Sequence, residues 1–83
     1  TPMEFTHHVY ILRCSNGTWY TGCTNDLDDR LVRHSKGMVQ YTSDKLPVEC
    51  ICAMGFQDKY KAFNFEKYLK TGSGRAFMRR HFV

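Results

Sequence analysis

The sequence lacks the features that would assign it to a membrane-spanning, secreted or disordered class. No apolar run approaches the about 18 residues that a membrane-spanning helix requires. No charged segment followed by an apolar one marks a secretion signal, and repeats, low-complexity segments and long linkers are absent. The 83 residues are therefore expected to form one domain over residues 1–83, cytoplasmic and without a membrane partner.

Zinc-site and disulfide patterns are also missing, although the chain contains four cysteines. The C-x2-4-C spacing typical of zinc sites does not occur. Cys50 and Cys52 stand two apart in an apolar run, where a regular strand would point both side chains to one face. Cys14 and Cys23 also fall in strand-like segments. Reduced thiols are the expected state, because nothing else here is typical of a secreted chain.

What is present is a globular composition with a modest positive charge. Hydrophobic residues make up 42% of the chain, which is too many for a disordered one. The net charge of +4 favours polyanionic partners. Basic residues cluster late in the chain, at Lys59, Lys61, Lys67, Lys70, Arg75, Arg79 and Arg80. Phosphate contacts are one interpretation of this cluster, and a solvated charged face is the other.

Strand-forming segments, turn residues and helix caps predict six elements. Strands are expected over residues 7–14, 18–23 and 48–56. Helices are expected from a cap within residues 24–26 to about residue 35, over about 59–71, and over 73–81. The order β-β-α-β-α-α predicts an α/β (α+β) fold with a three-stranded, mainly antiparallel sheet flanked by helices. The apolar third strand is expected to be buried on both sides.

The turn between the first two strands decides how Tyr10 and Tyr20 relate. A two-residue loop would place them on opposite faces of the sheet, whereas a three-residue loop would pair Leu12 with Tyr20 and place both tyrosines on one face. The longer loop also puts Gly17 at the left-handed bulge position that this turn prefers. We predict the three-residue loop, which the site chemistry described below also requires.

Glu66 stands out in the second predicted helix. At about 100° per residue, it lies only about 40° from Ala62 and about 60° from Leu69, within the apolar arc. A carboxylate there is costly unless it is paired or bound to a metal. An ion pair with Lys70, four residues later, is the structural explanation, and a metal site is the functional one.

Arg30 and His34 lie one turn apart on the first predicted helix. An arginine can stabilise the transition state of a phosphoryl group, and a histidine can relay protons. The alternative is a surface arginine paired with Asp26 or Asp29 beside a half-buried histidine.

These segments, taken together, resemble the GIY-YIG nuclease family over about residues 8–80. Val9-Tyr10-Ile11 and Tyr20-Thr21-Gly22 stand at the two signature tripeptides, and residues 24–34 resemble the pattern T-N-D-L-x-x-R-L-x-x-H. Residues 65–70 resemble the helix that bears the acidic residue of the family. Residues 73–77 are similar to small stand-alone bacterial members, related to the N-terminal nuclease domain of the excision-repair incision subunit.

The resemblance implies an endonuclease that hydrolyses DNA phosphodiester bonds with one Mg²⁺ or Mn²⁺ ion per active site. Glu66 matches the metal ligand and Arg30 matches the arginine that stabilises the transition state. Tyr10 and Tyr20 match the signature tyrosines, and Tyr10 is favoured as general base or water-orienting hydroxyl. His34 matches a position that is often histidine or tyrosine. A tyrosine base would need its pKa lowered by Arg30 and the metal.

The resemblance also implies a nucleic-acid surface and a role in DNA repair or recombination. Tyr41 lies in the loop where some members carry a further active-site hydroxyl or imidazole. The expected nucleic-acid contacts are Tyr41, Lys59, Lys67, Lys70 and Arg75. Sequence specificity is expected to be low, because so small a domain offers little surface for base readout. Branched, nicked or damaged DNA fits this picture, with a protein partner supplying the targeting.

The chain departs from the family pattern at three places. Val9 stands where the family has glycine, Thr21 stands where isoleucine is usual, and no asparagine follows the helix that bears Glu66. Two alternative functions are open, the first of which also explains the positive charge and the missing asparagine. A catalytically silent nucleic-acid-binding module would bind DNA in a salt-sensitive way without needing Glu66. A protein-interaction domain of the same fold would show neither DNA affinity nor a metal site.

Overall fold

The computed structural model describes residues 5–82 and contains the six predicted elements in the predicted order. The strands are β1 (His7–Arg13), β2 (Trp19–Thr24) and β3 (Glu49–Phe56). The helices are α1 (Leu27–Ser35), α2 (Lys59–Leu69) and α3 (Gly72–His81). The predicted α/β (α+β) fold is therefore confirmed. Residues 1–4 and 83, which the predicted domain includes, lie outside the described residues.

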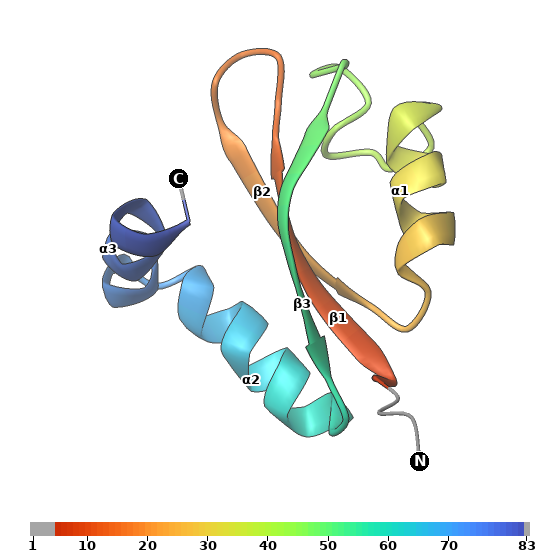
Figure 1. The fold of residues 1–83 in the computed structure, drawn as a ribbon. Helices are drawn as coiled ribbons and strands as arrows, with labels where there is room; N and C mark the ends of the chain where they lie inside the picture. The colour runs from red at the N-terminus through yellow and green to blue at the C-terminus, as the bar shows by residue number, and fades with distance from the viewer. Residues whose placement is uncertain (1–4, 83) are drawn as a thin grey trace.

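The sheet has the strand order β2-β1-β3, and both neighbouring pairs are antiparallel. Strand β1 is central, and its residues 9–12 are all buried. Helix α1 covers one face of the sheet, while α2 and α3 lie on the other (Figure 1). We refer to these two sides as the α1 face and the α2 face. The core cluster on the α2 face consists of Val9, Ile11, Ala62, Leu69 and Met78.

The hairpin between β1 and β2 has the predicted three-residue loop. Cys14 donates its backbone N–H to the carbonyl of Thr18 at 2.8 Å, which leaves residues 15–17 in the loop. Gly17 has a φ of 84°, the left-handed conformation that glycine adopts without strain. Leu12 pairs with Tyr20 in the resulting register, as predicted. Tyr10 and Tyr20 therefore both point to the α1 face.

Strand β3 does not have the predicted burial on both sides. It is an edge strand, and none of its residues is fully buried. The central place belongs to β1, because β1 pairs with its hairpin partner β2 on one side and with β3 on the other. A continuous apolar run therefore indicated a strand correctly but assigned it to the wrong position in the sheet.

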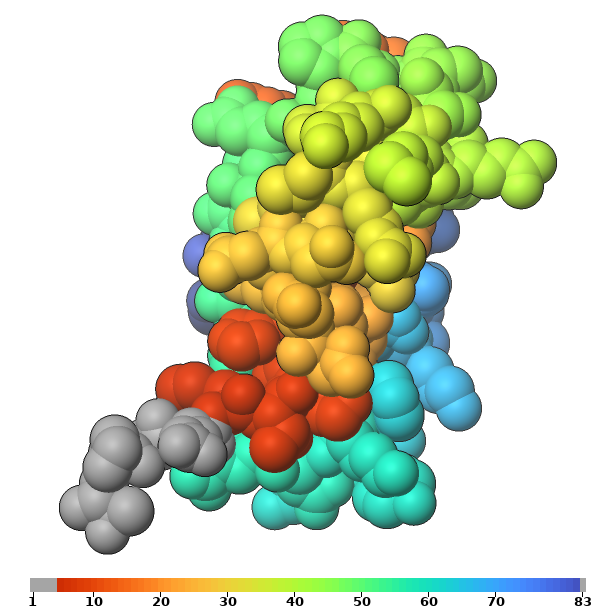
Figure 2. All heavy atoms as spheres, turned by 90° about the vertical axis from the view of Figure 1, so that its right-hand side faces the viewer, coloured from red at the N-terminus to blue at the C-terminus, as the bar shows by residue number. Residues whose placement is uncertain are grey.

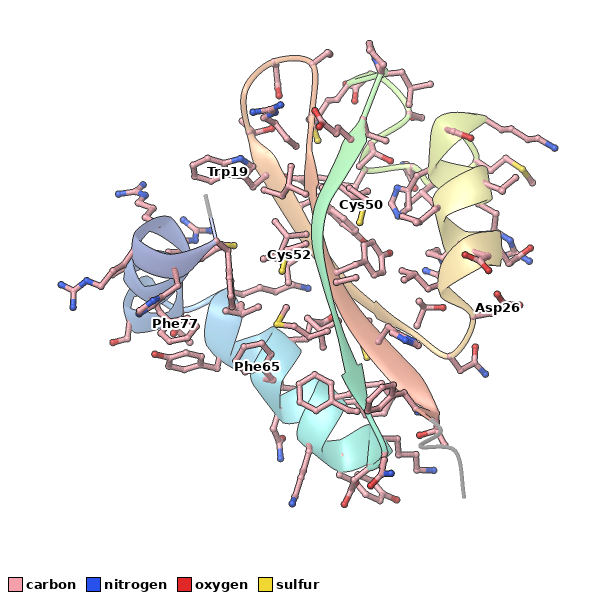
Figure 3. The ribbon with its side chains drawn as sticks, viewed as in Figure 1. Trp19, Asp26, Cys50, Cys52, Phe65 and Phe77 are labelled. Carbon is pink, nitrogen blue, oxygen red and sulfur yellow. The ribbon has the colours of Figure 1, made fainter. Side chains whose placement is uncertain are left out.

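The prediction that Cys50 and Cys52 share a face is also wrong. Ile11 pairs with Cys52 and Leu12 with Cys50, so Ile51 is the extra residue of a β-bulge. The bulge breaks the alternation of side chains, and the two thiols lie on opposite sides of β3 (Figure 3). All four cysteines of the chain are free thiols.

Polar side chains cap all three helices. Asp26 accepts from the N–H of Asp29, and Asp58 accepts from that of Tyr60. Helix α3 begins slightly earlier than predicted, because Thr71 accepts from the N–H of Gly74 at 3.1 Å and so acts as its cap. No helix within residues 5–82 is long and apolar enough to span a bilayer.

Candidate active site

Tyr10 projects from the central strand onto the α1 face and is fully buried. It pairs with Gly22 of β2, and its ring extends over that glycine. A Cβ atom at position 22 would clash with the Tyr10 hydroxyl and with its ring carbons. Gly22, in the second signature tripeptide, therefore leaves the space that the hydroxyl of Tyr10, in the first tripeptide, occupies.

His34, in the last turn of α1, forms a hydrogen bond with this hydroxyl. The Tyr10 Oη lies 3.0 Å from His34 Nε2, and His34 Nδ1 lies 2.7 Å from Thr42 Oγ1. Helix α1 and the following loop cover this part of the sheet (Figure 2). All three side chains are completely shielded from solvent. His34 is thus fully buried rather than half-buried.

The donor and acceptor in each of these hydrogen bonds are determined by the carbonyl oxygen of Val39, at the far end of the network. Thr42 donates its hydroxyl proton to the carbonyl oxygen of Val39 at 3.4 Å, since a carbonyl can only accept. The Thr42 oxygen is then free to accept the Nδ1–H of His34. His34 Nε2 is left with a lone pair that accepts the O–H of Tyr10. The network thus assigns His34 as a neutral proton acceptor facing Tyr10.

Burial controls the protonation of both groups. Burial lowers the pKa of His34 below its ordinary value, and the Arg30 guanidinium lowers it further. Burial raises the pKa of Tyr10 well above that of a free tyrosine, and nearby Tyr20 adds to this effect. Arg30 opposes the rise, as the sequence predicted, but burial outweighs it. At neutral pH the described residues therefore hold Tyr10 as a protonated phenol and His34 as a neutral imidazole.

Arg30 lies one turn before His34 and is partly exposed. The predicted alternative of an ion pair with Asp26 or Asp29 does not form. Asp29 pairs instead with Arg33 at 2.9 Å, and Asp26 caps the helix. Among residues 5–82 no carboxylate pairs with Arg30, yet its charge acts on both Tyr10 and His34. Its guanidinium is therefore available to an anion beside these two groups.

Tyr20 and Tyr41 extend the cluster toward solvent. The ring of Tyr20 lies 5.1 Å from that of His34 and 5.2 Å from that of Tyr41, between centroids. Tyr41 is half exposed, with the ammonium of Lys45 over its ring at 4.5 Å. The structure thus brings the predicted Tyr10, Tyr20, Arg30, His34 and Tyr41 into one cluster.

Glu66 approaches from the other side of the sheet. It lies on α2, its side chain is only 20% exposed, and it forms the predicted ion pair with Lys70 at 3.5 Å. Its carboxylate acts on Cys23, whose pKa is raised mainly by burial and further by Glu66. Cys23 follows Gly22 directly on β2. Glu66 and Tyr10 therefore reach the same edge strand, at neighbouring residues, from opposite faces.

This carboxylate matches the chemistry of one kind of metal site. Within residues 5–82, no group of three or more His, Cys, Asp or Glu side chains could hold an ion by itself. Mg²⁺, however, keeps several waters and binds through one or two carboxylates together with substrate phosphates. A largely buried carboxylate with one exposed lysine partner fits that mode, and it does not fit an all-protein cage.

A groove runs along the outer edge of β2, with a volume of about 610 Å³. Its lining comes from both sides of the sheet. Tyr20 and Tyr41 belong to the α1 side, whereas Lys70, Arg75 and Arg79 come from α2 and α3. Trp19 also lines it. We call this feature the β2 groove.

The predicted nucleic-acid contacts divide at this groove. Tyr41, Lys70 and Arg75 line it, whereas Lys59 and Lys67 do not. Lys59 lies at the first turn of α2 with its ammonium over the Tyr60 ring, while the groove meets α2 only at its last residues.

Thr42 and Trp19 were not identified as site residues from the sequence. Thr42 lies in a loop without periodicity, and Trp19 has the alternation of an ordinary strand residue.

The profile of the GIY-YIG catalytic domain matches residues 6–80, so the chain belongs to the GIY-YIG family. GIY-YIG domains form a superfamily of nucleases, and such a domain implies DNA as a substrate.

Among its relatives are small proteins of the UPF0213 group. One from Halalkalibacterium halodurans is 39% identical over 70 residues, which cover 83% of this chain and 74% of the relative. One from Halobacterium salinarum is 38% identical over 65 residues, covering 77% of this chain and 84% of the relative. The solution structure of the first of these proteins, described under the organism name Bacillus halodurans, matches with a TM-score of 0.58 and 36% identity, covering 89% of this chain and 80% of that one.

Proposed function

We propose that the protein is a metal-dependent DNA endonuclease whose site comprises Tyr10, Tyr20, Arg30, His34 and Glu66. The observation that carries this proposal is the buried hydrogen-bonded chain from Tyr10 through His34 to Thr42, with Arg30 beside it and without a carboxylate partner among residues 5–82. A buried neutral histidine that accepts from a phenol is suited to proton transfer. An available arginine next to it is suited to a phosphate.

Tyr10 and His34 act as a proton relay in this proposal. The Tyr10 hydroxyl is shielded in this structure, so binding of the substrate must first open a path for the attacking water. The oxygen of Tyr10 then accepts a proton from that water while its own proton passes to His34 Nε2. Thr42 stabilises the imidazolium that forms by accepting from Nδ1–H. A free phenolate is never populated, which reconciles the raised pKa of Tyr10 with its role.

Arg30 and Glu66 supply the charges around the phosphate. Arg30 donates charge-assisted hydrogen bonds to the non-bridging oxygens, where negative charge develops. Glu66 would hold one Mg²⁺ or Mn²⁺ ion, and such an ion neutralises charge on the phosphate and the leaving oxygen when bound. Lys70 must then leave Glu66, which its exposed side chain permits. Low sequence specificity, with a role in DNA repair or recombination and a partner for targeting, fits the small surface.

A cleavage assay tests the proposal. The purified chain is incubated with plasmid, single-stranded and branched DNA in Mg²⁺, Mn²⁺ or EDTA. Cutting is expected only with metal, and Glu66→Gln is expected to reduce it by about a hundred-fold or more, because metal stabilisation is worth several kcal/mol. The matched control is Glu49→Gln, since Glu49 is an exposed carboxylate paired with Arg13. Wild-type cutting by Glu66→Gln would show that the metal assignment is wrong.

The ion pair between Glu66 and Lys70 favours a second candidate, a catalytically silent nucleic-acid-binding module of the same fold. In that case Glu66 has a structural role, and no metal is needed. DNA binding without cleavage by the folded chain, on every substrate and with either metal, would support this candidate over the nuclease.

Thr42→Val is expected to lower kcat/KM by about ten-fold, because it removes the acceptor that stabilises the charged form of His34. Cleavage needs neutral His34, so the rate falls as pH drops through its pKa, which lies below 6.5. Losing the acceptor disfavours the imidazolium and lowers this pKa further. The acid limb of the pH–rate profile should therefore move to lower pH. A slower enzyme with an unmoved acid limb would mean that Thr42 only supports the fold.

A further inference from the structure

We propose that the β2 groove binds an unpaired DNA strand, so that the preferred substrate carries a single-stranded segment. This inference rests on the proposed function in one respect, because it takes the groove as the path that leads a strand into the active site. The binding itself depends only on the lining of the groove, and it can be measured without metal or cleavage.

The positive charge of the groove suits a phosphate backbone. Arg75 and Arg79 are four residues apart on α3, so they project from the same side of the helix into the groove. Both are exposed, and neither pairs with a carboxylate among residues 5–82. Lys70 adds a third cation from the end of α2. Exposed cations along a groove bind successive phosphates of one strand, and here Arg75 and Arg79 are unpaired within residues 5–82 whereas Lys70 pairs with Glu66.

The aromatic side chains of the groove select for unpaired bases. Trp19 is 36% exposed and Tyr41 is 53% exposed, and both line the groove together with Tyr20. Trp19 projects from β2 toward the side where α3 lies (Figure 3). An unpaired base of any sequence stacks favourably on such a ring, because every base has a π-face. In a duplex the faces of the bases are already stacked on each other, so these rings would find no partner there.

The groove also touches both halves of the proposed active site. Tyr20 lines it, and its ring lies 5.1 Å from the ring of His34. Lys70 lines it as well and pairs with Glu66. Because the groove follows the exposed edge of β2 at Trp19–Thr21, a strand lying in it passes from the α2 face to the α1 face immediately before Gly22 and Cys23. A bound strand would therefore place one phosphate between the Tyr10 cluster and Glu66.

Trp19 offers a direct measurement, since it is the only tryptophan of the chain. In EDTA, its fluorescence is followed during titration with an oligothymidylate of about 12 nucleotides, a length within the usual site size. The comparison ligands are a hairpin duplex and an abasic strand with the same number of phosphates. The oligothymidylate is expected to quench Trp19 and to bind at least about ten-fold more tightly than either comparison ligand. Equal affinity for duplex and single strand, or no quenching, would overturn the proposal.

Variants test the lining, with a labelled oligothymidylate followed by fluorescence anisotropy. Trp19→Ala and Arg79→Ala are each expected to weaken single-strand binding by about ten-fold. The matched controls are Tyr60→Ala, which removes an aromatic residue that is 65% exposed outside the groove, and Arg80→Ala, which removes the neighbouring cation. If the control variants lose as much single-strand affinity as the groove variants, the binding is non-specific electrostatic attraction, and the proposal that the groove binds the strand is wrong.

The same binding assay separates this inference from the proposed function. Glu66→Gln should bind the oligothymidylate at least as tightly as the wild type, because it removes a negative charge beside Lys70. Tight single-strand binding by a chain that cuts nothing would reject the nuclease and keep the groove. Metal-dependent cleavage of duplex and single strand at equal rates, with equal affinity, would keep the nuclease and reject the groove.

Discussion

Replacing Arg30 with alanine is expected to lower the kcat/KM of DNA cleavage by about a thousand-fold while the fold remains intact. Arg30 has no carboxylate partner among residues 5–82, so the folded chain loses no ion pair. The transition state would lose the cation whose charge acts on Tyr10 and His34. Single-turnover cleavage rates and circular dichroism spectra of the variant and the wild type provide the comparison.

Arg33→Ala is the matched control, because Arg33 lies three residues further along α1 and pairs with Asp29 on the surface. It is expected to change the rate less than about two-fold, since exposed ion pairs contribute little. The residual activity of Arg30→Ala carries a second signature. Arg30 lowers the pKa of His34, so its removal should raise that pKa and move the acid limb to higher pH. Loss of activity confined to unfolded protein would contradict this role for Arg30.

Gly74→Ala is expected to destabilise the folded chain by about 3 kcal/mol, because the packing of α3 leaves no space for the added methyl group. Gly74 is buried in the first turn of α3, and a Cβ there would clash with the backbone carbonyl of Tyr68 at the end of α2. A backbone atom cannot rotate away as a side chain can, so the two helices would have to separate. For a domain of this size the melting temperature should fall by roughly 12–24 °C, measured by circular dichroism.

Gly72→Ala provides the control for this prediction. Gly72 is also in the first turn of α3, but a Cβ added there meets no atom within 4 Å. Alanine lowers the conformational entropy of the unfolded chain, so this variant should gain about 0.4–1 kcal/mol. If both variants melt at the wild-type temperature, α3 does not pack against the end of α2 in the way the structure indicates.

Much of the candidate site was predictable from local sequence, because its geometry depends on short-range rules. The spacing of Arg30 and His34 places them on one side of a helix whatever the helix packs against. The preference of Gly17 for a left-handed turn determines the register of the hairpin, and the register places Tyr10 and Tyr20 on one face. Glu66 was identified because a carboxylate within an apolar arc is unusual.

Other features depend on contacts between segments that are distant along the chain. The sequence could not show that β3 lies at an edge, because an apolar run looks the same in a central strand and in a half-covered one. The bulge at Ile51 follows from the pairing of β3 with β1, and the pairing of His34 with Thr42 follows from how the loop folds back over α1. Neither has a local signal.

The sequence by itself therefore determined the order of the elements and the hairpin register, since each depends on residues within a few positions of one another. It also supplied the candidate site residues, whose roles remain a prediction. The tertiary structure alone decided that Tyr10 is a buried phenol bonded to a neutral His34, because burial is a property of the packed chain. It also decided that Glu66 reaches β2 from the opposite face, and that aromatic and basic residues line one groove. These arrangements join residues from both faces of the sheet, and only packing brings them together.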